Sequence, residues 1–193
     1  MRIDIVKKQV ADSLAVKQAI LNNAALMEQI ALVAEVCTEA YRRGNQVFFA
    51  GNGGSAADAQ HLAGEMVSKF YFDRPGIPAH ALTTDTSIIT AIGNDYGYDI
   101  VFARQLQAQG REGDIFVGIS TSGNSRNLVN CLETCKEKKI ISVALTGNQP
   151  CAMDSYDYVL KVPSSETPRI QECQTLIGHI ICCIVEQNLF GKD

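Results

Sequence analysis

The sequence lacks several features that would place it in other classes of protein. Its seven cysteines are odd in number and form no CxxC pair, which argues against a disulfide framework and favours reduced thiols in a reducing compartment. No apolar run is long enough to cross a membrane, and the charged N-terminus is not followed by the apolar core of a signal peptide. We therefore expect a cytoplasmic protein with no membrane partner.

Positive charge is not in excess either. The chain has 17 Lys and Arg against 21 Asp and Glu, so its net charge of −4 gives no electrostatic footprint for nucleic acid. It also has no linker, low-complexity segment or repeat of fixed period. The composition is that of an ordinary soluble protein, with 46% hydrophobic and 20% charged residues. A single domain over residues 1–193 is the simplest organisation.

Two kinds of hydrophobic pattern divide the chain. Residues 1–45 have apolar side chains at helical spacing, which predicts an N-terminal extension of two helices broken near Asn22 and Asn23. Residues 46–193 alternate short apolar runs with helical patterns, which predicts an α/β core with a five-stranded parallel sheet between helices. The predicted strands are 47–50, 79–82, 114–119, 140–145 and 158–162, and the longer predicted helices are 55–70, 98–109, 126–138 and 168–188.

The strongest functional signal is a loop of small polar residues, STSGNS at 120–125, which follows the third predicted strand. The next helix begins near Arg126, and unpaired N–H groups at a helix N-terminus attract an anion. The alternative interpretation is a simple N-cap turn, in which Ser, Asn and Gly are also common. However, five small polar residues around one glycine, at the carboxyl end of a parallel strand, favour a phosphate site. The hydroxyl donors would be Ser120, Thr121, Ser122 and Ser125.

A second loop, GNGGS at residues 51–55, follows the first predicted strand and has similar chemistry. Its glycines allow tight backbone geometry, and Ser55 can cap the helix that follows. The loop is neither GxGxxG nor the Walker pattern, because the required Lys is missing. A nucleotide is therefore not implied.

Polar side chains gather on one face of the helix after this loop. His61 and Glu65 are four positions apart and Asp58 is three before His61, so they can share a metal ion or pass a proton. A solvated ion pair is the alternative. His179 stands in an apolar stretch of the last helix, where a histidine is more often a satisfied core residue. Spacing alone leaves these alternatives open.

Four segments together resemble a known family: GNGGSAADAQHLAGE, AIGNDYG, GISTSGNS and PRIQE with a histidine eight positions beyond the Gln. In this order they resemble the phosphoheptose isomerases, which belong to the sugar isomerase (SIS) domain family. The likeness covers nearly the whole chain. It implies a three-layer, flavodoxin-like SIS fold. It also implies an aldose–ketose isomerase that converts D-sedoheptulose 7-phosphate to D-glycero-D-manno-heptose 7-phosphate through an enediol. That reaction is the first step of ADP- or GDP-heptose synthesis for lipopolysaccharide or capsule.

The resemblance also implies the roles of individual residues. Glu65 and His179 match the family's acid/base pair. One Zn²⁺ per subunit would be held by His61, Glu65, Gln171 and His179. The implied substrate contacts are Asn52, Gly53, Gly54, Glu65, Asn94, Asp95, Ser120, Thr121, Ser122, Ser125 and Gln171. The family usually forms homotetramers with active sites at subunit contacts, so a second copy of the chain is the expected partner.

Two observations qualify this picture. Gln171 and His179 are eight positions apart, about 12 Å along one helix, so we expect one of them to reach the metal from a neighbouring subunit. Gln174 stands where the family often has a histidine, which weakens a proton relay there. The alternative function is a non-catalytic SIS protein like the replication initiator-associating protein, which lacks matches to Glu65 and His179. Their presence favours the isomerase.

Overall fold

Five strands form one parallel sheet in the computed structural model, which describes residues 2–191. The sheet has the order β2-β1-β3-β4-β5, which is the flavodoxin-like order, and it confirms the predicted fold class. All residues of β1 and β3 are buried, as expected for a sheet covered on both faces. The strands are β1 Val47–Gly51, β2 Ala79–Ala81, β3 Ile115–Ile119, β4 Ile141–Thr146 and β5 Tyr158–Lys161.

Helices separate the strands, as the sequence predicts. They are α1 Arg2–Leu21, α2 Ala24–Arg42, α3 Gly54–Val67, α4 Thr86–Asp95, α5 Val101–Gln109, α6 Arg126–Val129, α7 Cys131–Lys138 and α8 Thr167–Phe190, with 3₁₀ turns η1 Tyr98–Ile100 and η2 Ala152–Ser155. Three details differ from expectation. The helix predicted over 55–70 ends at Val67, and the residues after it are irregular. The helix predicted over 126–138 is interrupted at Asn130, whose side chain donates to the Asp99 carbonyl (2.8 Å). Gly53, not Ser55, is the N-cap of α3, and Ser55 is buried inside the first turn.

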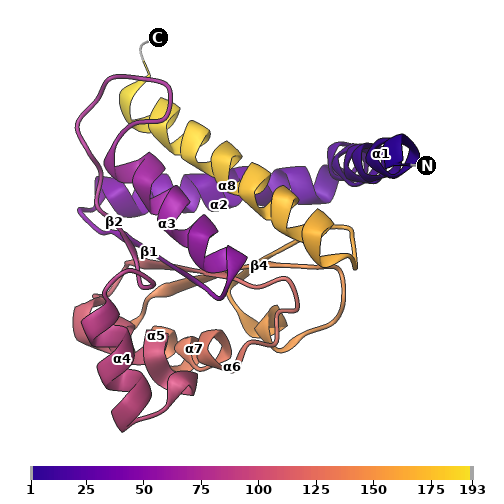
Figure 1. The fold of residues 1–193 in the computed structure, drawn as a ribbon. Helices are drawn as coiled ribbons and strands as arrows, with labels where there is room; N and C mark the ends of the chain where they lie inside the picture. Colours follow the sequence, from indigo (N-terminus) through magenta and orange to yellow (C-terminus); the bar gives the residue numbers. More distant parts are fainter. Residues whose placement is uncertain (1, 192–193) are drawn as a thin grey trace.

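Two hydrophobic cores lie on opposite faces of the sheet. One joins α2, α3 and α8 to the strands, and the other joins α4, α5, α6 and α7. Figure 1 shows these two layers of helices above and below the strands. The apolar composition of α8 is explained by this packing. By length and composition alone α8 could cross a membrane, but Ile177, Cys182 and Val185 are buried in the first core.

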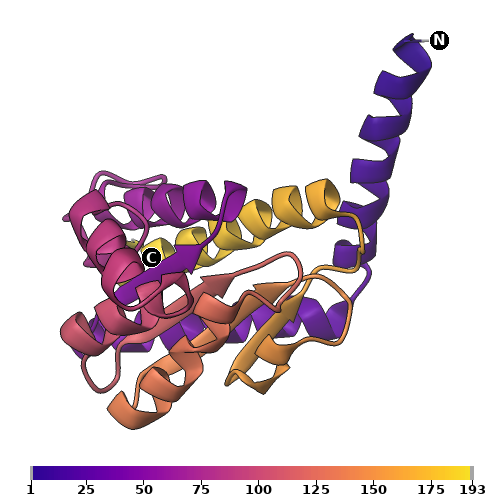
Figure 2. The same ribbon diagram turned by 60° about the horizontal axis from the view of Figure 1, so that its bottom comes forward.

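The first helix leaves the body of the molecule. α1 and α2 meet at an angle of 77°, at the predicted break, where the Asn23 side chain accepts from the Leu26 N–H (3.1 Å). Among residues 2–21 only Ile20 is buried, and Figure 2 shows α1 as a projecting arm. α2, in contrast, buries one apolar face in the core. The predicted N-terminal extension therefore consists of a projecting helix, α1, and a helix that packs in the core, α2.

Candidate active site

The two polar loops lie side by side at the carboxyl edge of the sheet. One follows β1 and the other β3, and these neighbouring strands pair through Gly51 and Ile119 at their ends. The strand order reverses at this point, which is where open α/β sheets bind ligands. Asn52 of the first loop and Asn127 of α6 exchange two amide hydrogen bonds of 3.0 and 2.9 Å. The Tyr98 hydroxyl also donates to Asn52 (3.1 Å), so the first loop is fixed from two elements.

The hydroxyl groups of the second loop converge. The Ser120 Oγ lies 3.2 Å from the Ser125 Oγ and 3.5 Å from the Ser122 Oγ, and it accepts from the Gly123 N–H (3.1 Å). Beside the loop is an open hollow of about 310 Å³, which has room for a phosphorylated end of a sugar. Its walls are Thr121, Ser122, Asn124, Gly147, Asn148, Gln149, Ser164, Ser165, Thr167 and Ile170. Three of the four predicted phosphate residues, Ser120, Ser122 and Ser125, are thus brought together, and Thr121 and Ser122 line the hollow.

The helices α3 and α8 run side by side across the face of the sheet that lies uppermost in Figure 1. Their contacts advance in step: Gly54 faces Gln171, Asp58 faces Thr175, and Leu62 packs on Gly178. A Cβ atom at Gly54 would collide with the Gln171 side-chain amide, so this glycine makes room for Gln171 beside the first loop. The parallel packing places polar residues of two distant segments in one row.

That row ends in a cluster of three potential metal ligands. The Nε2 atoms of His61 and His179 are 2.6 Å apart, and the His61 Nε2 lies 3.5 Å from a Glu65 carboxylate oxygen. All three ligand atoms lie within 4.8 Å of one another. His61 is exposed, while Glu65 and His179 are half-buried. Two imidazole nitrogens and a carboxylate oxygen, with one side open to solvent, form a group that could hold a metal ion.

Asp58 lies one turn before this group. Its Oδ1 accepts from the Thr175 hydroxyl (2.9 Å), and its buried Oδ2 has no hydrogen-bond partner within residues 2–191. Burial raises the pKa of Asp58, although the Thr175 bond and the two histidines of the group oppose that change. Asp58 therefore belongs to the same polar row and carries a carboxylate oxygen that no group of the described residues satisfies.

The structure does not unite every implied residue. One chain brings together His61, Glu65 and His179, but Gln171 lies two turns away beside Gly54. The expectation that one ligand comes from another subunit therefore stays a prediction, and Gln171 is the residue it concerns. Asn94 and Asp95 lie at the end of α4, under the opposite face of the sheet from α3, and hydrogen-bond to each other (2.7 Å). Their contact with substrate also stays a prediction.

Gln174 belongs to the core. It is 1% exposed, and its Nε2 donates to the Leu145 carbonyl (2.8 Å), which also accepts from the Ser120 N–H (3.0 Å). Gln174 therefore supports the start of the second loop from beneath. An amide in this buried position carries no proton between solvent and substrate.

Some residues around the site were not identified from the sequence. The Phe70 ring lies 5.6 Å from the His179 ring, and Asn127 and Tyr98 hold Asn52. Asn127 could have been noticed, because it stands in the first turn after STSGNS. No sequence pattern pointed to Phe70, because it lies in an irregular segment and its contact with His179 of α8 is formed only when the chain folds.

Comparison with known proteins identifies the family of the chain. The sequence model of the SIS domain family matches residues 11–147, so the chain is an SIS domain protein. It is 61% identical over 188 residues to phosphoheptose isomerase 2 of Campylobacter jejuni, covering 97% of this chain and 94% of that one. It is 60% identical to the phosphoheptose isomerase of Aneurinibacillus thermoaerophilus, covering 97% and 95%. A phosphoheptose isomerase structure from Francisella tularensis superposes with a TM-score of 0.92 at 36% identity, covering 97% and 99%. The chain belongs to the phosphoheptose isomerase family.

Proposed function

We propose that this protein is an isomerase that converts D-sedoheptulose 7-phosphate to D-glycero-D-manno-heptose 7-phosphate. The observation that carries the proposal is the row along α3 and α8, which leads from the first loop to the His61–Glu65–His179 group. Phosphoheptose isomerases 60% and 61% identical over nearly the whole chain support this substrate. The product would supply heptose precursors for a surface polysaccharide such as lipopolysaccharide or capsule.

The chain's own residues suit the proton movements of this reaction. The hydroxyls of the second loop would hold the phosphate and so fix the reacting end of the sugar near Glu65. Glu65 would take the proton from one carbon and return it to the neighbouring carbon, and His179 would move protons between the hydroxyl oxygens. Because an atom that binds a metal ion cannot also accept a proton, each residue would serve as metal ligand and as base in turn. Asn52, held by Asn127, and Gln171 would position the sugar hydroxyls.

The donor set of the His61–Glu65–His179 group fits Zn²⁺, which is commonly bound by imidazole nitrogen and carboxylate oxygen. When bound, the ion would polarise the carbonyl of the substrate as a Lewis acid. Three ligands from one chain leave a position for Gln171 of a second copy, so active sites would lie at subunit contacts. From the resemblance to the family and from the cysteine content, we propose that the assembly is a cytoplasmic homotetramer.

Product analysis with sedoheptulose 7-phosphate tests the proposal. The wild-type protein should form the aldose, and chelation should abolish turnover until Zn²⁺ is restored. Glu65→Gln should lower kcat by about 10²–10⁴-fold, because the amide cannot accept a proton. Glu133→Gln, the same substitution at an exposed residue of α7, is the control and should keep normal turnover. A folded Glu65→Gln enzyme with wild-type kcat would remove Glu65 from the mechanism, and a wild-type protein that forms no aldose would refute the function.

A further inference from the structure

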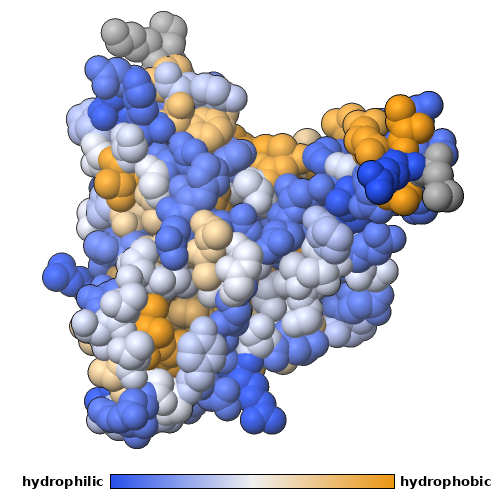
Figure 3. Space-filling view, in the orientation of Figure 1, coloured by the Kyte–Doolittle hydropathy of each residue, from blue (hydrophilic) through white to orange (hydrophobic). Residues whose placement is uncertain are grey.

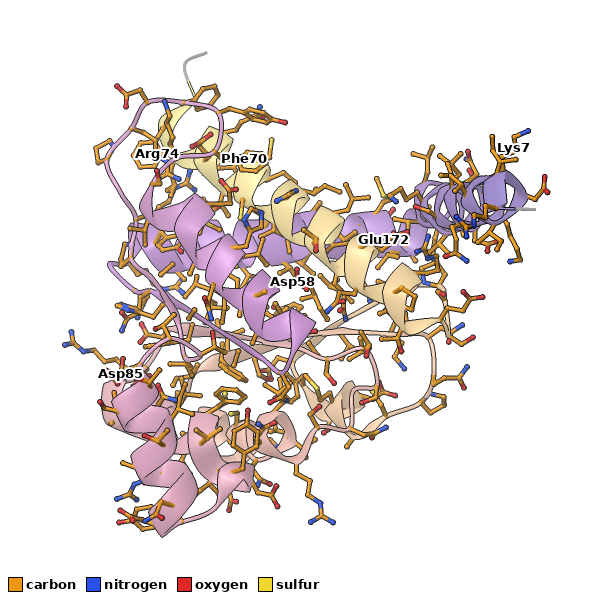
Figure 4. All side chains as sticks on the ribbon, in the orientation of Figure 1. Lys7, Asp58, Phe70, Arg74, Asp85 and Glu172 are labelled. Carbon is orange, nitrogen blue, oxygen red and sulfur yellow. The ribbon has the colours of Figure 1, made fainter. Side chains whose placement is uncertain are left out.

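The segment between α3 and β2, residues 68–78, folds over the C-terminal half of α8, where Figure 4 labels Phe70 and Arg74. At its centre Arg74 and Glu186 form an ion pair, with 2.9 Å between Nε and Oε1. Their side chains are 2% and 1% exposed. Burying two charges is costly unless their other polar atoms are also paired. The remaining partners of this pair therefore indicate its role.

Glu186 fixes the backbone of the segment. Its carboxylate accepts from three successive N–H groups, those of Phe70 (2.8 Å), Tyr71 and Phe72 (3.1 Å). Burial works against ionisation, but these bonds and Arg74 outweigh it and hold the pKa of Glu186 below its usual value. The carboxylate is therefore ionised at neutral pH, and it holds three residues in one place.

Arg74 fixes the end of α3. Carbonyl groups at a helix C-terminus lack partners, and a cation there complements the helix dipole. The guanidinium donates to the carbonyls of Glu65 (2.9 Å), Met66 (2.7 Å), Ser68 (3.3 Å) and Pro75 (3.1 Å). Because Glu65 is one of these residues, Arg74 holds the backbone that carries the carboxylate of the potential metal group.

Each residue of the ion pair is thus connected to the His61–Glu65–His179 group. Arg74 holds the backbone of Glu65, and Glu186 holds Phe70, whose ring packs on the ring of His179. We propose that Arg74 and Glu186 are positioning residues for the His61–Glu65–His179 group, an inference whose activity measurement rests on the proposed function. They act through the backbone of Glu65 and the ring of Phe70.

Two substitutions test the proposal and a third is its matched control. Glu186→Gln keeps the size of the side chain but replaces one acceptor oxygen with a donor. Arg74→Lys keeps the charge but cannot reach four carbonyls at once. The control is Asp114→Asn at the amino edge of the sheet. Asp114 is also 1% exposed and also accepts backbone N–H groups, those of Gln46 (3.1 Å) and Arg111 (2.9 Å).

The measurements are Zn²⁺ affinity by chelator competition, kcat and KM for sedoheptulose 7-phosphate, and hydrogen exchange at residues 70–72, all on the full chain. Both test variants should bind Zn²⁺ about tenfold more weakly, since supports of metal ligands have effects of this size. Their kcat should fall about tenfold with KM unchanged, and exchange at 70–72 should accelerate. Asp114→Asn should lower the melting temperature comparably yet keep Zn²⁺ affinity and kcat within about twofold of wild type.

Test variants that melt earlier but keep wild-type Zn²⁺ affinity and kcat would overturn the proposal, because the ion pair would then be structural only. If Glu186→Gln does not fold, Arg74→Lys decides by the same comparison. If the wild-type protein binds Zn²⁺ but forms no aldose, the proposed function fails. The difference in Zn²⁺ affinity between the test variants and Asp114→Asn still decides the positioning role in that case.

Discussion

At Gly54 a hydrogen in place of a side chain leaves room for the Gln171 amide. Gly54→Ala should displace this flexible side chain, lowering kcat/KM about tenfold while the melting temperature changes little. Gly64→Ala in the same helix is the control, because beyond the neighbouring residues and the surrounding helix backbone no heavy atom among residues 2–191 lies within 4 Å of the added methyl. It should keep full activity and raise the free energy of unfolding by about 0.5–1 kcal/mol. Kinetics and thermal unfolding measure both. Full activity in Gly54→Ala would mean that Gln171 is not needed there.

The sequence predicted those residues of the site that share a loop or one helical turn. His61 and Glu65 meet because they are four positions apart, and the serines of the second loop meet because they lie within six successive positions. Spacing could not decide whether His179 was a core residue or a ligand, because its place depends on how α8 packs against α3. The resemblance to the family implied that His179 is a ligand, and the structure places its Nε2 atom 2.6 Å from the Nε2 atom of His61.

The segment 68–78 depends on one carboxylate, and this makes its stability depend on pH. The pKa of Glu186 is lower in the folded chain than its usual value of about 4.3, so its stabilising effect is complete above that value and is lost as pH falls through the folded pKa. Below about pH 4 the melting temperature of wild type should fall more steeply than that of Glu186→Gln. Thermal unfolding between pH 3 and pH 7 measures this, and equal slopes would contradict it.

Among the elements, the strands were predicted to within about two residues, because each is a short apolar run between turn residues. The path of segment 68–78 was not predicted, and residues 68–70 were wrongly expected to be helical, since the two partners that fix the segment, Arg74 and Glu186, are 112 positions apart. The interruption at Asn130 was also missed, because the helical pattern of 126–138 is continuous in the sequence. Local patterns determine the regular elements here, and long-range polar contacts determine the irregular ones.

On the scale of the whole molecule, the arm α1 carries an apolar stripe that its own chain leaves uncovered. Ile3, Val6, Val10 and Leu14 recur at helical spacing and are 55–65% exposed, and Figure 3 shows hydrophobic surface on the arm. We expect this stripe to be an oligomer contact. Leu14→Glu should shift the protein toward smaller species in light scattering, whereas Ala15→Glu, exposed and about 100° around the helix, should not. A wild-type monomer, or no shift in Leu14→Glu, would contradict this.

If the apolar stripe of α1 is an oligomer contact, the activity of each chain depends on the concentration of the protein. A stripe that is covered only by another molecule is covered according to mass action, so dilution uncovers it. Where the assembly also supplies Gln171 to a neighbour's site, each dissociation removes working sites as well as contacts. Turnover per chain would then rise with protein concentration before it levels off, and a cell that made little of this protein would have less enzyme than its number of chains suggests.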